Sequence, residues 1–454
     1  MIWKPVKDTG LRNICASLEP AFFTSERWFS HREHPGELKL EDMLVFQSNF
    51  FKDGCFCFLL LSMASAASEE AGFFYFIPLW AVRGKTKEPP LFVKEGYSFV
   101  DGIHSPYYWS VIQQGFLEEA YETSSGLFSF SSESWTLPVE GHLHGSSSNS
   151  LLFVSQRFLV KNYRLVFPGI NPELELNRAL SRKGAGNVPK VYGSLNYQSK
   201  DGFYTLAMVQ EWVAHQGSGW EVYRRLLTDQ GKDSHRELLQ ECFELGKVLG
   251  EFHRELAQIS REEKRFNCFT LEMLTEKVES LEKLVRLSLK KDLPAEAEAT
   301  IEKLKKLQHA LSGEDLGYCF RIHGDLHLEQ VLKTDSGWLI IDLEGEPLKP
   351  IHERGCYDSP LKDVASMLRS FSYRMHGLGL TDPERLEDEL ADRFWEGYSK
   401  ACGLEWLPEP TVSQRLLELF QLERVVYEFN YELKYRPDWA IIPRNGLKRL
   451  IGKK

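Results

Sequence analysis

The stretch from Phe320 to Pro347 constrains the fold of this 454-residue chain more than any other. Two short apolar runs, Val331 to Lys333 and Trp338 to Ile341, flank the polar segment 334–337, Thr-Asp-Ser-Gly. Apolar runs separated by a short polar segment that contains glycine predict a β-hairpin. Such a hairpin brings the residues before its first strand and those at the end of its second strand to one end of a small ribbon.

Oxygen-bearing side chains gather at that end of the predicted hairpin. Asp325 and Gln330 precede the first strand, and Asp342 ends the second. The spacing from Asp325 to Gln330 matches that from the catalytic Asp to the metal-binding Asn of protein kinases, and Asp342 stands where kinases place a second metal ligand. Glu344 faces the same side as Asp342 if the chain stays extended. Acids beside a turn can be merely solvated, but the combined pattern favours phosphoryl transfer from ATP, with Asp325 as base and Mg²⁺ held by Gln330 and Asp342.

The composition of the chain limits its fold class and its partners. The chain is 43% hydrophobic and 26% charged, which predicts a globular protein of about two to four domains. The formal net charge of −10 argues against nucleic acid or an anionic membrane as the main partner. Eight scattered cysteines without a zinc-type cluster fit reduced thiols. Because no signal-type segment follows Met1 and the apolar stretches are short for a bilayer, we expect a cytoplasmic protein.

Three segments of different character divide the chain. Residues 1–95 contain runs rich in Phe, Val and Leu that predict an antiparallel sheet with short helices, closed by a Pro-containing connector. Residues 96–211 continue with strands and polar loops and carry the candidates for a nucleotide site. Residues 212–454 show helical periodicity on both sides of the hairpin, most clearly between Arg236 and Ile259.

The middle segment supplies the nucleotide candidates. The loop 145–150 is rich in serine, and its Ser147 and Ser148 can cover phosphates with hydroxyl and backbone N–H groups, although a plain hairpin loop is the alternative. Lys161 follows where kinases place the phosphate-pairing lysine. Glu175, in the helix that opens after an Asn-Pro pair, is its expected partner. The expected hinge, whose backbone meets adenine in kinase-like folds, contains Gln210, Glu211 and Val213.

Aromatic and acidic residues near the C-terminus predict an acceptor site. Tyr427 and Tyr431 are four apart, as are the adjacent Glu428 and Glu432, so each pair forms a stripe on one helix. Trp439 follows shortly after. Flat rings suit the C–H faces of sugars, and carboxylates accept hydrogen bonds from hydroxyls. A half-buried amphipathic helix is the alternative interpretation.

Longer motifs carry a family resemblance. Three runs, 321–330 (Arg-x-His-Gly-Asp-x-His-Leu-x-Gln), 342–347 (Asp-x-Glu-Gly-Glu-Pro) and 427–439, resemble maltokinases, within the aminoglycoside-phosphotransferase-like branch of eukaryotic-like kinases. The resemblance implies an α+β, bilobal, protein-kinase-like fold with a β-rich N-lobe, a mostly helical C-lobe and an extra N-terminal cap. It also implies transfer of the ATP γ-phosphate to the anomeric 1-OH of maltose, feeding α-glucan (glycogen) synthesis.

The same resemblance assigns roles to single residues. Glu344 becomes an auxiliary magnesium ligand, and a trehalose-to-maltose isomerase (trehalose synthase) becomes a candidate partner. The resemblance also implies these sugar contacts: His323, Tyr427, Tyr431, Glu432 and Trp439. Residues 30–33, Ser-His-Arg-Glu, depart from the Gly/Lys-rich continuation usual in that family. Two alternatives stay open: a kinase of glucosamine or another small sugar or aminoglycoside on the same scaffold, and a non-catalytic nucleotide-binding scaffold.

Overall fold

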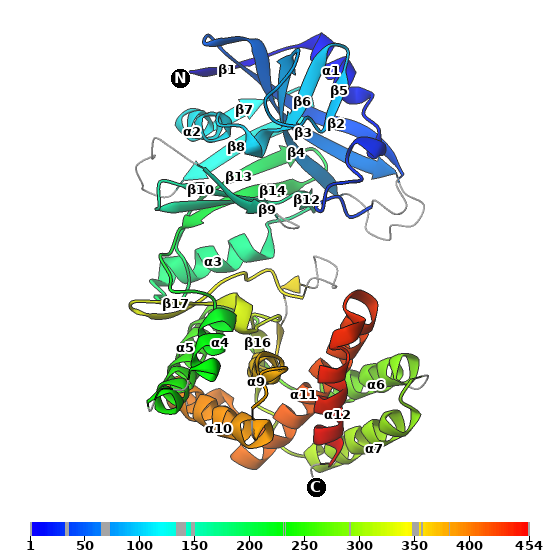
Figure 1. The fold of residues 1–454 in the computed structure, drawn as a ribbon, viewed down its shortest axis with the longest axis vertical. Coiled ribbons are helices and arrows are strands. Elements are labelled where there is room, and N and C mark those ends of the chain that lie inside the picture. The colour runs from blue at the N-terminus through cyan, green and yellow to red at the C-terminus, as the bar shows by residue number, and fades with distance from the viewer. Residues whose placement is uncertain are drawn as a thin grey trace. The chain divides into compact units, whose positions relative to one another are not determined.

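The computed structural model (Figure 1) describes residues 2–31, 36–64, 73–132, 142–146, 150–229, 231, 233–289, 292–346, 354–355, 357–380 and 382–452. The chain divides into two compact units. The first comprises Met1–Ser181 and Pro189–Ala214, and the second comprises Arg182–Val188 and His215–Lys454. The predicted N-terminal segment therefore lies in the same compact unit as the predicted nucleotide-binding segment.

The first sheet confirms the antiparallel sheet predicted near the N-terminus. It has seven strands in the order β1-β2-β3-β4-β6-β5, with β12 paired to β4. Their bounds are β1 Trp3–Val6, β2 Glu37–Ser48, β3 Phe51–Ala64, β4 Phe74–Arg83, β5 Phe92–Lys94, β6 Tyr97–Asp101 and β12 Leu165–Val166. Because β6 pairs with β4 and β12 joins the same sheet, the sheet extends beyond residue 95 and takes a strand from the next segment.

Strand β3 explains why this region is so apolar. Its Phe56 and Phe58 pack into one hydrophobic cluster, while Cys57 and Leu59 pack into another that includes residues of helix α1 (Thr9–Ala16). Alternate side chains of a strand point to opposite faces, so a strand covered on both faces must be apolar at every position. The continuous apolar run is thus a buried strand.

The second sheet of this unit has seven strands in the order β7-β8-β13-β14-β11-β10-β9. The bounds are β7 Ala120–Glu122, β8 Gly126–Ser132, β9 His142–Ser146, β10 Ser150–Val154, β11 Phe158–Asn162, β13 Val191–Ser199 and β14 Phe203–Glu211, with helices α2 Tyr108–Glu118 and α3 Pro172–Lys183. Phe128 and Leu206 of this sheet share a core with Phe56 and Phe58 of the first. The two sheets therefore form one folding unit.

The second unit is mainly helical (Figure 1). Its helices are α4 Gly219–Thr228, α5 Ser234–Glu262, α6 Leu271–Ser288, α7 Pro294–Leu311, α9 Leu361–Met375, α10 Pro383–Ala401, α11 Pro410–Tyr435 and α12 Ile441–Gly452. Helices α5 and α10 pack closely because Gly246 and Gly397 face the partner backbone: an added Cβ would lie 2.1 Å from the Phe394 carbonyl oxygen and 2.0 Å from the Phe243 carbonyl oxygen, respectively. Helix α7 begins at Pro294, whose missing N–H is tolerated in the first turn of a helix.

The predicted hairpin is also confirmed. Strands β17 (Val331–Thr334) and β18 (Gly337–Ile340) pair antiparallel, with Val331 opposite Ile340. A three-stranded sheet, β15 Asn267–Cys268, β16 Tyr318–Arg321 and β19 Tyr357–Asp358, leads into the same region.

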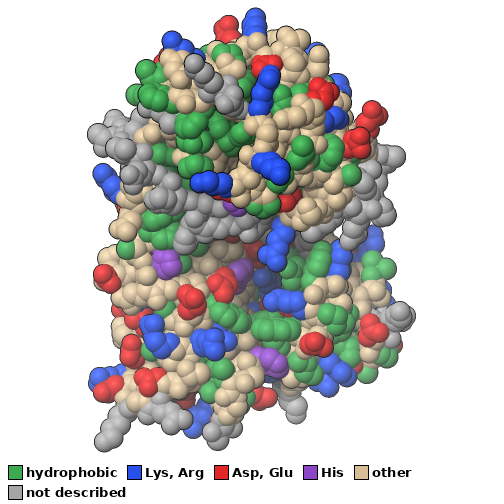
Figure 2. Space-filling model, turned by 45° about the horizontal axis from the view of Figure 1, so that its top comes forward, with side chains coloured by type: hydrophobic (Ala, Val, Ile, Leu, Met, Phe, Trp, Pro, Cys, Tyr) green, Lys and Arg blue, Asp and Glu red, His purple; other side chains and the backbone are tan. Residues whose placement is uncertain are grey.

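The molecular surface is mixed in charge. Lys and Arg side chains are interspersed with Asp and Glu side chains over much of the face drawn in Figure 2. Among the described residues, we find no helix long and apolar enough to cross a membrane.

Candidate active site

A sharp turn after β16 presents the predicted catalytic residue. Gly324 has φ +85°, a left-handed conformation that favours glycine, and Asp325 follows it. Asp363 of α9 stabilises this turn. Its side chain is fully buried and accepts hydrogen bonds from the backbone N–H groups of His323 (2.8 Å) and Gly324 (2.9 Å). His253 of α5 contacts the same carboxylate at 3.1 Å. Charged hydrogen bonds of this kind fix the backbone that carries Asp325.

His323 does not have the role that the resemblance assigned to it. Its side chain is 1% exposed, and Nε2 lies 3.0 Å from the carbonyl oxygen of Ile341. Its Nδ1 accepts from the backbone N–H of Asp325 at 3.3 Å. His323 therefore joins the turn to the end of the hairpin from inside the fold, which favours a structural role over a sugar contact.

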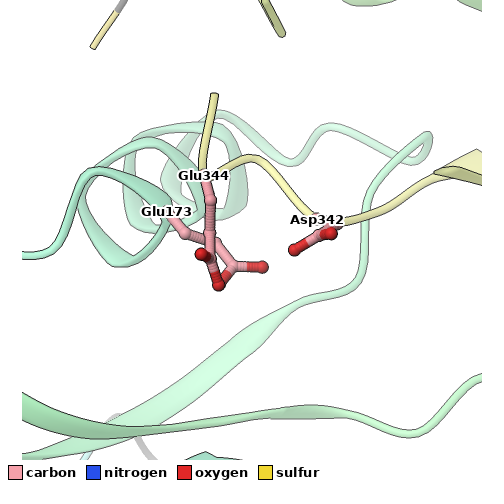
Figure 3. Close-up of side chains that lie close together, drawn as sticks. All are labelled: Glu173, Asp342 and Glu344. Carbon is pink, nitrogen blue, oxygen red and sulfur yellow. The ribbon is translucent and has the colours of Figure 1, made fainter. Parts of the chain in front are cut away.

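The hairpin brings Gln330 and Asp342 together, as predicted. Gln330 Nε2 donates to Asp342 Oδ2 at 3.0 Å. Asp342 has φ +63°, an uncommon conformation for a non-glycine residue of the kind that clusters at functional sites. Figure 3 shows Asp342 and Glu344 on the loop that follows β18, and carboxylate oxygens of these two residues lie within 4.8 Å of each other.

These residues fit a divalent cation. Two half-buried carboxylates close together are the hard oxygen donors that Mg²⁺ prefers. Gln330 uses its amide nitrogen on Asp342, so its oxygen would reach the same cation only if the amide turned over. Asp342 and Glu344 are thus the stronger metal candidates, and Gln330 supports Asp342.

A cavity of about 620 Å³ in the helical unit opens beside Asp325. Its lining combines aromatic rings, carboxylates and guanidinium groups: Trp220, Asp325, His327, Leu328, Glu329, Ser366, Ser370, Tyr373, Arg424, Tyr427, Glu428, Tyr431, Glu432, Arg436 and Trp439. Four predicted sugar contacts, Tyr427, Tyr431, Glu432 and Trp439, therefore line the same cavity as the predicted base.

Helix α11 supplies one wall of this cavity. The rings of Tyr427 and Tyr431 stack with centroids 6.4 Å apart, as the four-residue spacing predicts. Glu432 is 2% exposed; its Oε1 accepts from Arg436 Nη2 at 2.7 Å, and the Tyr373 hydroxyl lies near enough to lower the pKa of the carboxylate. Burial raises the pKa of Glu432, although Arg436 opposes that shift. A buried acceptor oxygen that lines a cavity is suited to a hydroxyl or ammonium group of a ligand.

Several residues that line the cavity were not predicted from the sequence. His327 lies two residues after Asp325, and burial lowers the pKa of His327 to about 4, so its ring is neutral near pH 7. Its Nδ1 accepts from the backbone N–H of Glu329 at 3.2 Å. Trp220 and Tyr373 come from α4 and α9. The His-Gly-Asp-x-His run contained His327, but no sequence signal placed Trp220 or Tyr373 here.

The nucleotide candidates in the first unit need one correction. Lys161 on β11 forms an ion pair with Glu173 at 2.9 Å, and within the described part of the chain we find no ion pair with the predicted Glu175. Glu173 is 1% exposed, whereas Glu175 is exposed. Positions two apart on a helix point about 200° apart, so only one of the two acids can face β11. Figure 3 shows Glu173 at the start of α3, where Asn171 caps the helix by accepting from the Glu173 N–H at 2.9 Å.

The remaining nucleotide candidates stay predictions. Gln210 and Glu211 end β14, and Val213 follows in the segment leading to the second unit. The backbone N–H of Glu211 donates to the Lys190 carbonyl at 2.8 Å, so that group is already used within the protein. Ser147 and Ser148 lie outside the described residues.

The match to known proteins follows this geometry. Residues 140–408 match the model of the phosphotransferase enzyme family (APH), which is more than half of the chain. The chain belongs to this family, and membership implies the use of ATP and a divalent metal.

One sequence relative and two solved structures show which members of the family this chain is similar to. Glucosamine kinase of Mycolicibacterium smegmatis (strain ATCC 700084 / mc(2)155) is 24% identical over 322 residues, covering 67% of this chain and 77% of that protein. A solved glucosamine kinase (crystal form B) aligns with TM-score 0.72 and 17% identity over 97% of this chain and 99% of its own. A glucosamine kinase in complex with glucosamine, ADP and inorganic phosphate aligns with TM-score 0.67 and 18% identity over 96% and 98%. The fold is thus the mixed α+β kinase-like fold, with a sheet-rich N-terminal region and a helical C-terminal region.

Proposed function

We propose that this protein is an ATP-dependent kinase that phosphorylates a hydroxyl group of a small sugar, with glucosamine as the first acceptor to test. One observation carries the proposal: Asp325 lines the same cavity as the Tyr427–Tyr431 stack and the buried carboxylates of Glu428 and Glu432. Rings that cover the apolar faces of a sugar and carboxylates that accept from its polar groups are the chemistry of a sugar site.

In this proposal Asp325 is the general base. Its Oδ1 accepts from Arg424 at 2.9 Å, and its side chain is 15% exposed, so the carboxylate is accessible from the cavity. The proton of the acceptor hydroxyl passes to Asp325 as the oxygen–phosphorus bond forms and the bond from the γ-phosphorus to the bridging oxygen of ATP breaks, releasing ADP. Asp342 and Glu344 would hold a Mg²⁺ ion, which would supply positive charge against the phosphates of ATP.

The comparisons favour glucosamine over the maltose that the sequence resemblance implied. The relatives reported above are glucosamine kinases. Maltose remains a second candidate because the tyrosine stripe continues outward, with the Tyr431 and Tyr435 rings 4.8 Å apart. A cavity of about 620 Å³ also lies within the range of about 300–1,000 Å³ typical of drug-sized ligands, which is roomy for a single sugar ring.

A panel of acceptors tests the proposal. ADP release is measured with ATP, MgCl₂ and glucosamine, glucose, maltose or an aminoglycoside, and the product phosphate is located by ³¹P–¹H NMR. We expect the largest kcat/KM for glucosamine. Preference for maltose would support the second candidate. Binding of ATP without sugar-dependent ADP release from any member would contradict the kinase proposal and favour a nucleotide-binding scaffold.

A further inference from the structure

Arg424 of α11 lies between two carboxylates of the acceptor cavity. Its Nη1 donates to Asp325 Oδ1 at 2.9 Å, and its Nε lies 3.5 Å from Glu428 Oε1. Its guanidinium also lies over the Tyr427 ring, 5.1 Å from the centroid. The side chain is 17% exposed. A planar group held at its edge and on its face has little freedom to turn.

A second arginine, Arg369, binds the other oxygen of Glu428. Glu428 Oε2 accepts from Arg369 Nε at 3.3 Å and from Arg369 Nη2 at 3.1 Å. Arg369, on α9, is 3% exposed, and its Nη1 donates to Ser372 at 3.1 Å. The order Asp325, Arg424, Glu428, Arg369 therefore alternates in charge from the cavity into the packed helices. Hydrogen bonds join Arg424 to Asp325 and Arg369 to Glu428, while Arg424 and Glu428 attract each other as an ion pair at 3.5 Å.

Asp325 depends on this row for its orientation. Among the described residues its Oδ1 accepts from Arg424, and no hydrogen bond to Oδ2 is found. With Oδ1 engaged, Oδ2 is the oxygen left to receive a proton from an acceptor. Burial alone would lower the pKa of Arg424, but the carboxylates of Asp325 and Glu428 raise it, so the guanidinium keeps its charge.

We propose that Arg424 is a positioning residue that holds the Asp325 carboxylate with Oδ2 turned to the acceptor hydroxyl. This inference rests on the proposed function, in which Asp325 is the base. Arg424 acts through Asp325, so its removal lowers turnover rather than acceptor binding. A guanidinium that instead binds the sugar would raise the acceptor KM and leave kcat unchanged.

A double-mutant cycle tests the proposal in the full chain, with Arg424→Met, Asp325→Asn and both together. General bases contribute about 10²- to 10⁴-fold, so misorienting one should cost Arg424→Met about 10- to 100-fold in kcat. The acceptor KM should change less than about 3-fold. The double variant should be no slower than Asp325→Asn alone, because Arg424 has nothing left to position. Arg424→Lys, which keeps the charge, should recover part of the rate.

Arg415 provides the matched control. It lies on the same helix and donates to the Ala310 carbonyl at 3.1 Å, so Arg415→Met should leave kcat unchanged. Normal ATP binding by each variant shows that the chain is folded; if Arg424→Met fails that check, Arg424→Lys and Arg424→Gln carry the cycle. Additive losses in the double variant, or a raised acceptor KM with normal kcat, would overturn the inference.

The cycle also separates two failures. If Asp325→Asn turns over normally, the proposed function is wrong. If Asp325→Asn is slow but every Arg424 variant matches wild type, only the positioning role is wrong.

Discussion

Asp363 offers the most quantitative prediction about how the catalytic turn is held. Asp363→Asn keeps one acceptor oxygen but replaces the other with an amide donor. One of the two backbone N–H groups, at His323 or Gly324, then loses a charged partner in a site that is fully buried. A hydrogen bond to a charged group contributes about 1.5–3 kcal/mol, and a buried unsatisfied donor costs about 1–3 kcal/mol. We expect the free energy of unfolding to fall by about 3 kcal/mol.

Thermal melting followed by tryptophan fluorescence measures this loss. For a unit of this size 1 kcal/mol corresponds to about 2–4 °C, so the midpoint should fall by about 6–12 °C. Asp388→Asn is the control, because Asp388 is 61% exposed and forms an exposed ion pair with Arg449. Surface pairs contribute about 0–1 kcal/mol, so this variant should melt near wild type.

The stability loss caused by Asp363→Asn should also depend on pH. Burial raises the pKa of Asp363, but the hydrogen bond and charge of His253 outweigh burial and hold it below its ordinary value. A lowered folded pKa gives stability that is present above the unfolded pKa, about 3.9, and is lost as the pH falls through the folded value. The difference between wild type and Asp363→Asn should therefore shrink below about pH 4. A loss under about 1 kcal/mol at pH 7, or a difference that does not change with pH, would refute this reasoning.

Three further predictions concern the acceptor site, the Lys161–Glu173 pair and the metal site. Tyr431→Ala should raise the acceptor KM about 2- to 10-fold with little effect on the ATP KM, measured by steady-state kinetics, since aromatic contacts are worth about 0.5–1.5 kcal/mol; an unchanged acceptor KM would show that the sugar lies elsewhere. Glu173→Gln should weaken turnover more than Glu175→Gln, since Glu173 holds Lys161, and equal effects in kcat measurements would contradict the observed pairing. Asp342→Asn should increase the MgCl₂ concentration needed for half-maximal rate, and an unchanged magnesium titration would remove Asp342 from the metal site.

Local spacing made much of the site predictable. The hairpin depends on neighbouring residues, so the two apolar runs pair across the polar segment as predicted, with Val331 opposite Ile340. The four-residue spacing of Tyr427 and Tyr431 fixed a common helix face before any tertiary contact was known. Such patterns depend only on the residue spacing within one strand or helix, so they remain valid when that element packs against others.

Other features depend on packing between distant segments. The choice of Glu173 over Glu175 depends on how α3 is rotated against β11, which a cap signal does not specify. Arg424 is 99 positions from Asp325 in sequence, so no local sequence pattern predicts their contact. The N-terminal sheet extends past its connector because β6 returns to β4, a long-range pairing that composition does not encode.

The most direct test of the central claim, that Asp325 removes the proton from a sugar hydroxyl, is the single-turnover rate of Asp325→Asn with saturating ATP, Mg²⁺ and glucosamine. The asparagine keeps the shape but cannot accept a proton as a carboxylate does, so the rate should fall at least about 100-fold while ATP binding stays normal. A variant that transfers the phosphoryl group at the wild-type rate would show that Asp325 is not the base.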